Sequence, residues 1–199
     1  MLGSLFSSIA LWRFRHSSGA EIDLSRLISR FLKKGKNGAG FQYKANTLYG
    51  KSERDMDDVF FFDAPYRIIL YGFKNNVSVP IACIAFIQTG PRSVCINQIQ
   101  GPSYDRSEEN TAARIAALSE VKWERLLVRV VCEWARKNRI ESVEMISCKK
   151  SRWYRDFRHK QMFIRYDVTA RRMGFKESDK EGIYKIDTNR MRLLKEAAV

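Results

Sequence analysis

The sequence predicts an α/β fold in which helices flank a central, mostly antiparallel mixed sheet. Runs of strand-forming residues between positions 59 and 100 are separated by turn signals, a pattern typical of an antiparallel meander. A strongly amphipathic segment at 122–137 then precedes a short apolar run at 142–148. A strand, a crossover helix and a second strand form a parallel unit, which would make the sheet mixed. The chain is 45% hydrophobic and 12% aromatic, enough for a packed core.

The meander should contain four strands. The third of them is a nearly continuous apolar run from Ile81 to Ile87, as expected of a strand that is covered on both faces. Asn75-Asn76 and Thr89-Gly90-Pro91 separate the last three strands. The expected strands are Val59–Phe62, Tyr66–Phe73, Val79–Gln88 and Ser93–Gln100.

The segment 122–137 is the clearest predicted helix, because its large apolar residues recur at helical spacing and form one stripe. A shorter helix at 168–173 should end at Gly174, since glycine is the usual residue after a helix C-terminus. A final strand is expected at 183–186 and a C-terminal helix at 190–198. The stripe of the long helix contains Trp123, Leu126, Leu127, Val130, Val131 and Trp134.

The N-terminal part has a different character. Residues 22–34 show helical spacing and Gly35 is a plausible stop, whereas residues 41–55 are polar and show no clear period. The loop 35–40 is rich in Gly and Lys but lacks the Lys-Ser/Thr ending of a nucleotide-binding loop, so a flexible linker is expected. We therefore expect a basic, helical extension at 1–55, packed on or continuous with a core at 56–199.

Several protein classes are disfavoured. No window of 18 uninterrupted apolar residues occurs, so no transmembrane helix is expected. The apolar start, residues 1–12, is followed rather than preceded by positive charge, which is the wrong order for a secretory signal. Four cysteines without a C-x-x-C pair and only two histidines make a metal site unexpected. Reduced structural cysteines in a cytoplasmic protein fit this pattern.

One motif has the features of a phosphate-binding turn. Gln98-Ile99-Gln100-Gly101-Pro102-Ser103 stands at the C-terminal end of a predicted strand and upstream of a helix. Backbone N–H groups at such a place are available donors backed by a helix dipole, so they can bind phosphate groups.

This order of elements resembles the GNAT family of acyltransferases, which transfer acetyl groups from coenzyme A. The family has a Gln/Arg-x-x-Gly-x-Gly/Ala turn that binds the pyrophosphate of acetyl-CoA. Gln98 and Gly101 match it, and Ser103 stands where Gly or Ala is usual. The closing residues 171–175 and 183–186 match the family's last helix and strand, so the resemblance spans roughly 60–188. It implies a GNAT-like fold and transfer of an acyl group to an amine on a small molecule or a protein.

The resemblance also implies roles for particular side chains. Its tyrosine, which protonates the leaving thiolate, would fall at Ala170, and Tyr166 lies one helical turn earlier as the candidate acid. An insert at 104–121 separates the turn from the long helix and contains a possible short helix at 110–118. Glu108 and Glu109 in this insert are candidate bases, with Asp167 as another option, because the attacking amine must lose a proton.

The charge of the chain is unevenly distributed. The net charge is +14, of which 12–54 and 149–172 contribute +7 each. The second segment interleaves cations with aromatic residues, which suits a solvated face, a nucleic acid or an anionic small ligand such as coenzyme A. A non-catalytic protein of the same fold that binds nucleic acid, or a relative that uses an aminoacyl-tRNA, is therefore the alternative function. Its contact residues would be Lys149, Lys150, Arg152, Trp153, Arg155 and Arg158.

Overall fold

The computed structural model describes residues 11, 13–17, 19–33, 41–50, 60, 64–74, 77–101 and 108–189. Five expectations lie wholly or mostly outside the described residues. They are the apolar start at 1–12, the Gly/Lys loop at 35–40, the strand at 59–62, the Asn75-Asn76 turn and the C-terminal helix at 190–198.

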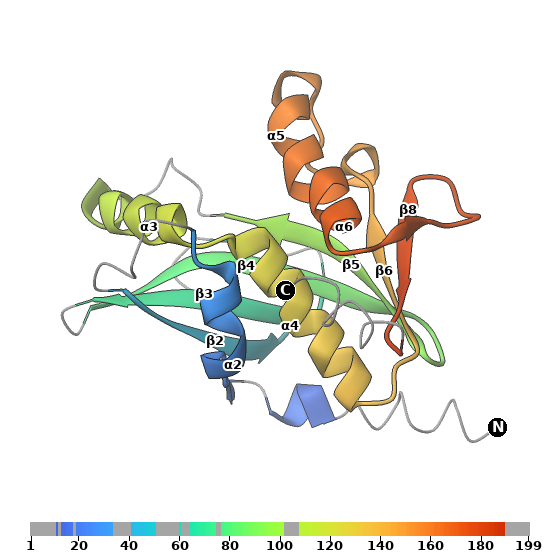
Figure 1. Cartoon of the computed structure of the whole chain (residues 1–199), viewed down its shortest axis with the longest axis horizontal. Coiled ribbons are helices and arrows are strands. Elements are labelled where there is room, and N and C mark those ends of the chain that lie inside the picture. The colour runs from blue at the N-terminus through green and yellow to red at the C-terminus, as the bar shows by residue number, and fades with distance from the viewer. Residues whose placement is uncertain are drawn as a thin grey trace. The chain divides into compact units, whose positions relative to one another are not determined.

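Within the described residues, eight strands hydrogen-bond in the order β1-β2-β3-β4-β5-β6-β8-β7 (Figure 1). The first five follow the chain: β1 (Glu21–Ile22), β2 (Gln42–Tyr49), β3 (Tyr66–Lys74), β4 (Val77–Gly90) and β5 (Ser93–Gln100). The remaining strands are β6 (Ser142–Ile146), β7 (Lys176–Glu177) and β8 (Ile183–Asp187).

The sheet is mixed, as predicted. β1 pairs antiparallel with β2 and β2 with β3, and β8 pairs antiparallel with both β6 and β7. β5 and β6 are parallel, with Ser93 opposite Ser142 and Ile96 opposite Met145. This pair joins the ends of the predicted crossover. The expected fold class, a mostly antiparallel mixed sheet with flanking helices, is confirmed.

The chain divides into two compact units. One contains Phe14–Ala85 and Gln98–Leu127, and the other contains Met1–Arg13, Phe86–Asn97 and Val128–Val199. The expected boundary between residues 55 and 56 stays a prediction.

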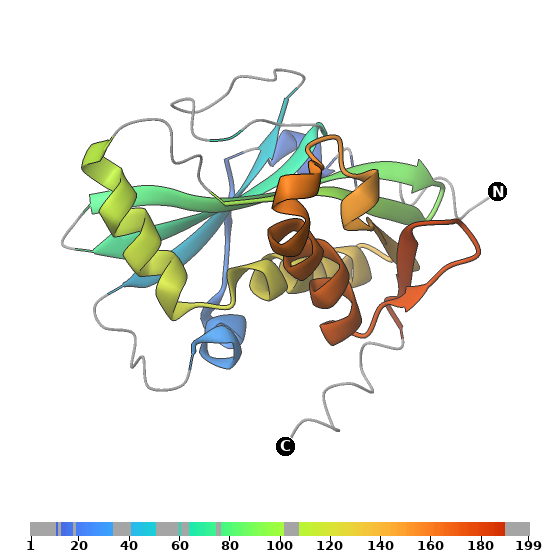
Figure 2. The same ribbon diagram turned by 90° about the horizontal axis from the view of Figure 1, so that it is seen from above.

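In the first unit, two helices accompany strands β1 to β3. α2 (Ser25–Phe31) is followed by Leu32, which forms an isolated bridge with Val121. α3 (Glu108–Glu120) lies against β3: a Cβ placed on Gly72 would stand 3.1 Å from the Cβ of Ala117. The absence of a side chain at Gly72 therefore leaves room for this close approach. Figure 2 shows α3 lying across the strands.

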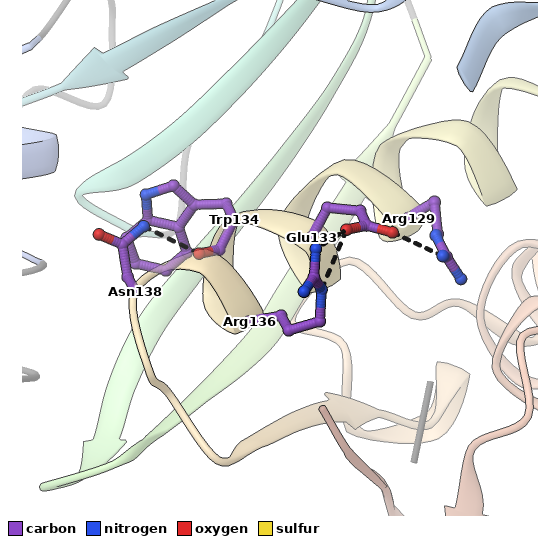
Figure 3. Close-up of polar contacts among 5 residues, drawn as sticks. All are labelled: Arg129, Glu133, Trp134, Arg136 and Asn138. Atoms are coloured by element: carbon purple, nitrogen blue, oxygen red, sulfur yellow. Dashed lines mark hydrogen bonds and ion pairs between the residues drawn. The ribbon is translucent and has the colours of Figure 1, made fainter. Parts of the chain in front are cut away.

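α4 (Trp123–Lys137) has the predicted bounds to within one residue and buries its apolar stripe. Trp134 packs on Phe86 of β4 with a centroid distance of 5.2 Å. On the outer side, Arg136 donates to Glu133 at 3.0 and 3.2 Å and Arg129 donates to the other carboxylate oxygen of Glu133 (Figure 3). Burial would raise the pKa of Glu133, but the two arginines outweigh it and hold that pKa below its ordinary value.

The second unit closes with a stack of short helical segments. These are two 3₁₀ turns (Cys148–Lys150 and Asp156–Arg158), α5 (His159–Phe163), a π-helical turn (Ile164–Val168) and α6 (Thr169–Arg172). Gly174 has a φ of 81°, and the N–H of Phe175 donates to the carbonyl of Ala170 at 3.0 Å. This is the predicted glycine-terminated helix end.

The structure differs from the expectations in the N-terminal part. The polar residues 42–49, which show no clear period, form the eight-residue strand β2. The helix expected at 22–34 is confined to Ser25–Phe31, because the backbone of Leu32 and Lys33 turns to pair with the segment after α3. The strand expected at 142–148 ends at Ile146, and Cys148 begins a 3₁₀ turn.

All four cysteines are free and buried, in agreement with the expected structural thiols. Burial raises the pKa of Cys132 to about 12. Burial, followed by the nearby Glu144 charge, raises the pKa of Cys95 to about 12. For Cys148 burial and a hydrogen bond to Asp167 raise the pKa to about 11. Folding therefore favours the protonated thiols.

We predict that these thiols make the protein less stable at high pH. Below about pH 8 both states keep the thiol protons. Above about pH 9 the unfolded chain releases protons that the folded chain retains, so the free energy of unfolding falls by up to about 1.4 kcal/mol per pH unit for each such thiol. Urea unfolding from pH 7 to 11 would measure this. Cys132→Ala should give a shallower decrease than the parent protein; an identical decrease would contradict the assignment.

Candidate functional site

The Gln98-x-x-Gly101-x-Ser103 turn begins where β5 ends. Gln98 is 1% exposed, and its Nε2 donates to Oε1 of Gln100 at 2.8 Å. Ile99 is also buried, and Gly101 follows directly after the strand. Pro102 and Ser103 lie outside the described residues. The described half of the predicted phosphate turn therefore stands at a strand end, as the sequence indicates.

The insert after this turn is mostly helical. α3 begins at Glu108 and ends at Glu120, which is longer at both ends than the expected helix at 110–118. Only 104–107 separate Ser103 from this helix. The candidate bases Glu108 and Glu109 occupy its first turn, where their side chains lie outside the described part of the structure. A helix thus follows the turn closely, as the phosphate-binding role requires.

α3 buries two charged side chains. Its inward face carries Arg114, Ala117 and Glu120, and Arg114 and Glu120 are each 5% exposed. The Nε of Arg114 is buried and has no hydrogen-bond acceptor among the described residues. A buried N–H donor without an acceptor is costly, and a hydrogen bond from this nitrogen to an anion would offset that cost.

Glu120 has a partner of its own. The hydroxyl of Tyr43 donates to the carbonyl of Ala117 at 2.9 Å and lies 3.5 Å from Oε2 of Glu120. Burial, then the negative charge of Glu120, raises the pKa of Tyr43 above its ordinary value. This contact ties the C-terminal end of α3 to β2.

A cavity of about 570 Å³ also lies in this unit, between α2 and β2. Its two wall carboxylates are engaged within the chain: Glu21 pairs with Lys44 at 3.0 Å, and Asp23 accepts from the N–H of Ser25 at 2.9 Å. The cavity therefore offers a ligand mainly apolar and aromatic walls.

In the second unit, a buried carboxylate connects three segments. Asp167 lies in the π-helical turn and is 6% exposed. One of its oxygens accepts from the N–H of Cys148 at 2.9 Å and the other from the hydroxyl of Tyr184 at 2.9 Å. Burial and Asp167 raise the pKa of Tyr184. Asp167 thus joins the end of β6, the closing helix and β8.

Tyr166, the candidate acid, lies in the same π-helical turn and is 1% exposed. Ala170, at the position where the family resemblance places a tyrosine, is fully buried one helical turn later. Both residues therefore lie on the inward side of the closing helix. π-Helical turns inside α-helices occur frequently at functional sites, because the extra residue re-aims the side chains around it.

The second basic segment begins next to this carboxylate. The basic connector, residues 149–160, runs from the end of β6 to α5 (Figure 1). Its six cations are exposed, as are Trp153 and Phe157, with 39% and 81% of their surface accessible. The exposed cations are Lys149, Lys150, Arg152, Arg155, Arg158 and Lys160.

Sequence reasoning missed Arg114, and it placed Asp167 only among the candidate bases, without its structural contacts. Arg114 could have been found, because it falls at core spacing with Ala117 and Val121 in a helix of small residues. The pairing of Asp167 with Tyr184 had no signal, since it joins residues 17 positions apart in separate elements. In the described residues, no helix is long and apolar enough to cross a membrane, and no cluster of His, Cys, Asp or Glu could hold a metal ion.

We predict that Asp167 is a structural anchor. Asp167→Ala leaves the N–H of Cys148 and the hydroxyl of Tyr184 without their acceptor, so it should destabilise the fold by roughly 2–5 kcal/mol. Tyr184→Phe removes one of the two bonds and should cost about 1–3 kcal/mol. Chemical denaturation measures both. A loss below about 0.5 kcal/mol for Asp167→Ala would show that the carboxylate does not hold these segments together.

Comparison with known proteins finds no matching family model and no matching curated protein sequence. Solved structures do match. A domain from Methanocaldococcus jannaschii has 15% identity and a TM-score of 0.36, covering 61% of this chain and 66% of that chain. A probable acetyltransferase from Staphylococcus epidermidis has 11% identity and a TM-score of 0.31, covering 61% of this chain and 68% of that one. The AtaT toxin, bound to the C-terminus of the antitoxin AtaR and acetyl-CoA, has 11% identity and a TM-score of 0.35, covering 77% and 98%. These matches, all with TM-scores below 0.5, include a probable acetyltransferase and a toxin bound to acetyl-CoA.

Proposed function

We propose that this protein is an acyl-CoA-dependent N-acyltransferase. The observation that carries the proposal is the buried Arg114 on α3, the helix that follows the Gln98-x-x-Gly101 turn in the same unit. A pyrophosphate could be bound by the combination of a strand end, a glycine turn, a helix start and a buried cation. The resemblance to acetyltransferases supports acetyl-CoA as the acyl donor.

Each feature would contribute differently to holding the donor. The backbone N–H groups after Gly101 and at the start of α3 would bind phosphate oxygens, aided by the positive end of the helix dipole. Gly101 would allow the backbone to approach the phosphates closely. Arg114 would supply a fixed cation, and its charge is worth more in a buried site than in water. Binding of the donor would thus offset the cost of burying the Arg114 side chain.

In the proposed reaction, the nitrogen of the acceptor amine attacks the thioester carbonyl carbon, a C–N bond forms and the C–S bond breaks. A carboxylate, Glu108 or Glu109, takes the proton that the amine loses, and Tyr166 gives a proton to the departing thiolate. A backbone N–H of β5, of Asn97 or Ile99, would polarise the thioester oxygen. The acceptor is an amine on a small molecule or a protein.

The buried thiols bear on where the protein works. Four free cysteines persist as thiols in a reducing compartment. We therefore propose a cytoplasmic protein.

The first prediction from this proposal concerns acetyl-CoA and Arg114. At 100 times its dissociation constant, acetyl-CoA should stabilise the protein by about 2.7 kcal/mol, a rise of roughly 5–10 °C in Tm. Arg114→Met should abolish this rise while leaving the free protein as stable as the parent or more stable, because it removes a buried charge whose Nε has no acceptor among the described residues. If Arg114 had a purely structural role, its substitution would not abolish the acetyl-CoA shift in Tm while leaving the stability of the free protein unchanged.

Two variants serve as controls for the acetyl-CoA measurement. Arg26→Met removes an exposed cation from α2 and should keep the full shift. Gly101→Val places a side chain where a phosphate must approach and should lose the shift. If Arg114→Met keeps the full acetyl-CoA shift, Arg114 does not bind the donor. If neither acetyl-CoA nor CoA shifts Tm of the parent protein, the acyltransferase function is wrong.

The second prediction concerns the proton transfers. With an amine acceptor in hand, Tyr166→Phe should lower kcat about 10²- to 10⁴-fold with little change in the KM for acetyl-CoA, since a lost general acid affects the chemical step. Glu108→Gln combined with Glu109→Gln should lower the rate most at neutral pH and recover part of it as rising pH deprotonates the amine. Unchanged kcat in Tyr166→Phe would exclude this tyrosine as the acid.

A further inference from the structure

The basic connector, residues 149–160, has a composition that the proposed acyl transfer does not use. It contains six exposed cations and a single acidic residue, Asp156. Its aromatic residues Trp153 and Phe157 are exposed rather than packed in the core. A polyanion that also carries flat apolar groups would complement such a segment, because its charges would pair with the cations and its flat groups would stack on the aromatic rings.

The connector is held in a defined conformation at its start. The N–H of Cys148 donates to the buried Asp167, and the N–H of Ser147 donates to the carbonyl of Gly182 at 2.8 Å. In the 3₁₀ turns at Cys148–Lys150 and Asp156–Arg158, every side chain except that of the buried Cys148 is exposed. Because the backbone is already ordered, a ligand would not have to bear the full entropic cost of ordering it.

Cations and aromatic rings in the connector are arranged in pairs. The guanidinium of Arg152 lies over the Trp153 ring at 5.6 Å from its centroid, and that of Arg158 lies over Phe157 at 5.3 Å. Each pair offers a flat surface for stacking next to a positive charge. Stacking on bases and neutralising phosphates are the two contacts that single strands make with proteins.

We propose that the connector binds single-stranded nucleic acid. Bases inside a duplex are already stacked on one another, so only a single strand can use both aromatic faces. An anionic membrane would also attract the charge. However, an amphipathic helix that lies on a membrane presents a continuous apolar face to the lipid, whereas the connector consists of two 3₁₀ turns joined by bends and has no such face. The inference is independent of acyl transfer.

The test measures binding of fluorescein-labelled U12 and dT12, with a 12-base-pair duplex as a comparison, by anisotropy at several salt concentrations. Lys149→Ala combined with Lys150→Ala should weaken single-strand binding and reduce the salt slope by about 1.4, from about 0.7 for each phosphate contact. Lys137→Ala combined with Lys176→Ala removes the same charge elsewhere in the same unit and should leave the slope unchanged.

The aromatic contacts have their own readout. Trp153→Ala should weaken binding of U12 or dT12 about 5- to 100-fold with the salt slope unchanged, and should leave duplex binding unaffected. Trp153→Phe keeps an aromatic face and should restore most of the affinity. Comparison of U12 with dT12 shows whether RNA or DNA is preferred.

Three results would overturn the inference. The first is that neither oligonucleotide binds. The second is that the connector variants match the Lys137/Lys176 control. The third is that phosphatidylserine vesicles bind through the connector while the oligonucleotides do not, which would make it a membrane surface. Circular dichroism and Tm verify that each variant is folded before its binding is interpreted.

Discussion

The cost of burying a charge is the constraint that separates structure from function in this protein. Asp167 and Arg114 are both more than nine-tenths buried. Asp167 meets the constraint within the chain, since its two oxygens accept from a backbone N–H and a tyrosine hydroxyl. The Nε of Arg114 has no acceptor in the described part of the chain. The carboxylate is therefore compensated within the fold, whereas Arg114 keeps a buried donor that the proposed acyl donor would satisfy.

Periodicity predicted the elements whose apolar residues alone determine their position. α4 and β5 were predicted almost to the residue, because their large apolar side chains recur at one period and end at clear signals. The Gly174 helix end was predictable for the same reason, since the left-handed conformation there favours glycine. These elements define the mixed sheet, so the fold class could be read from the sequence.

The elements that sequence reasoning missed are stabilised by partners far away in the chain. In β2 only Ala45 and Thr47 are buried, and its pairing with β3 over all eight residues supplies what its own pattern lacks. α3 was predicted only as the shorter helix 110–118. Its buried face contains Arg114 and Glu120, and charged residues in a sequence are normally taken to be exposed to solvent. The contact between Asp167 and Tyr184 depends on the register of β8 and on a π-helical turn, neither of which leaves a local signal.

Burial also distinguishes the two proposed phosphate-binding elements. The connector carries its cations in solvent, where salt screens them within a Debye length of about 8 Å at physiological ionic strength. Arg114 is 5% exposed, so mobile ions screen its field far less. A strand bound by the connector would gain affinity mainly from released counterions, whereas a phosphate held by Arg114 would gain it from a fixed charge in a medium of low polarity. The connector, with its six exposed cations, is therefore suited to a long polyanion, and the buried guanidinium of Arg114 is suited to a small, precisely placed one.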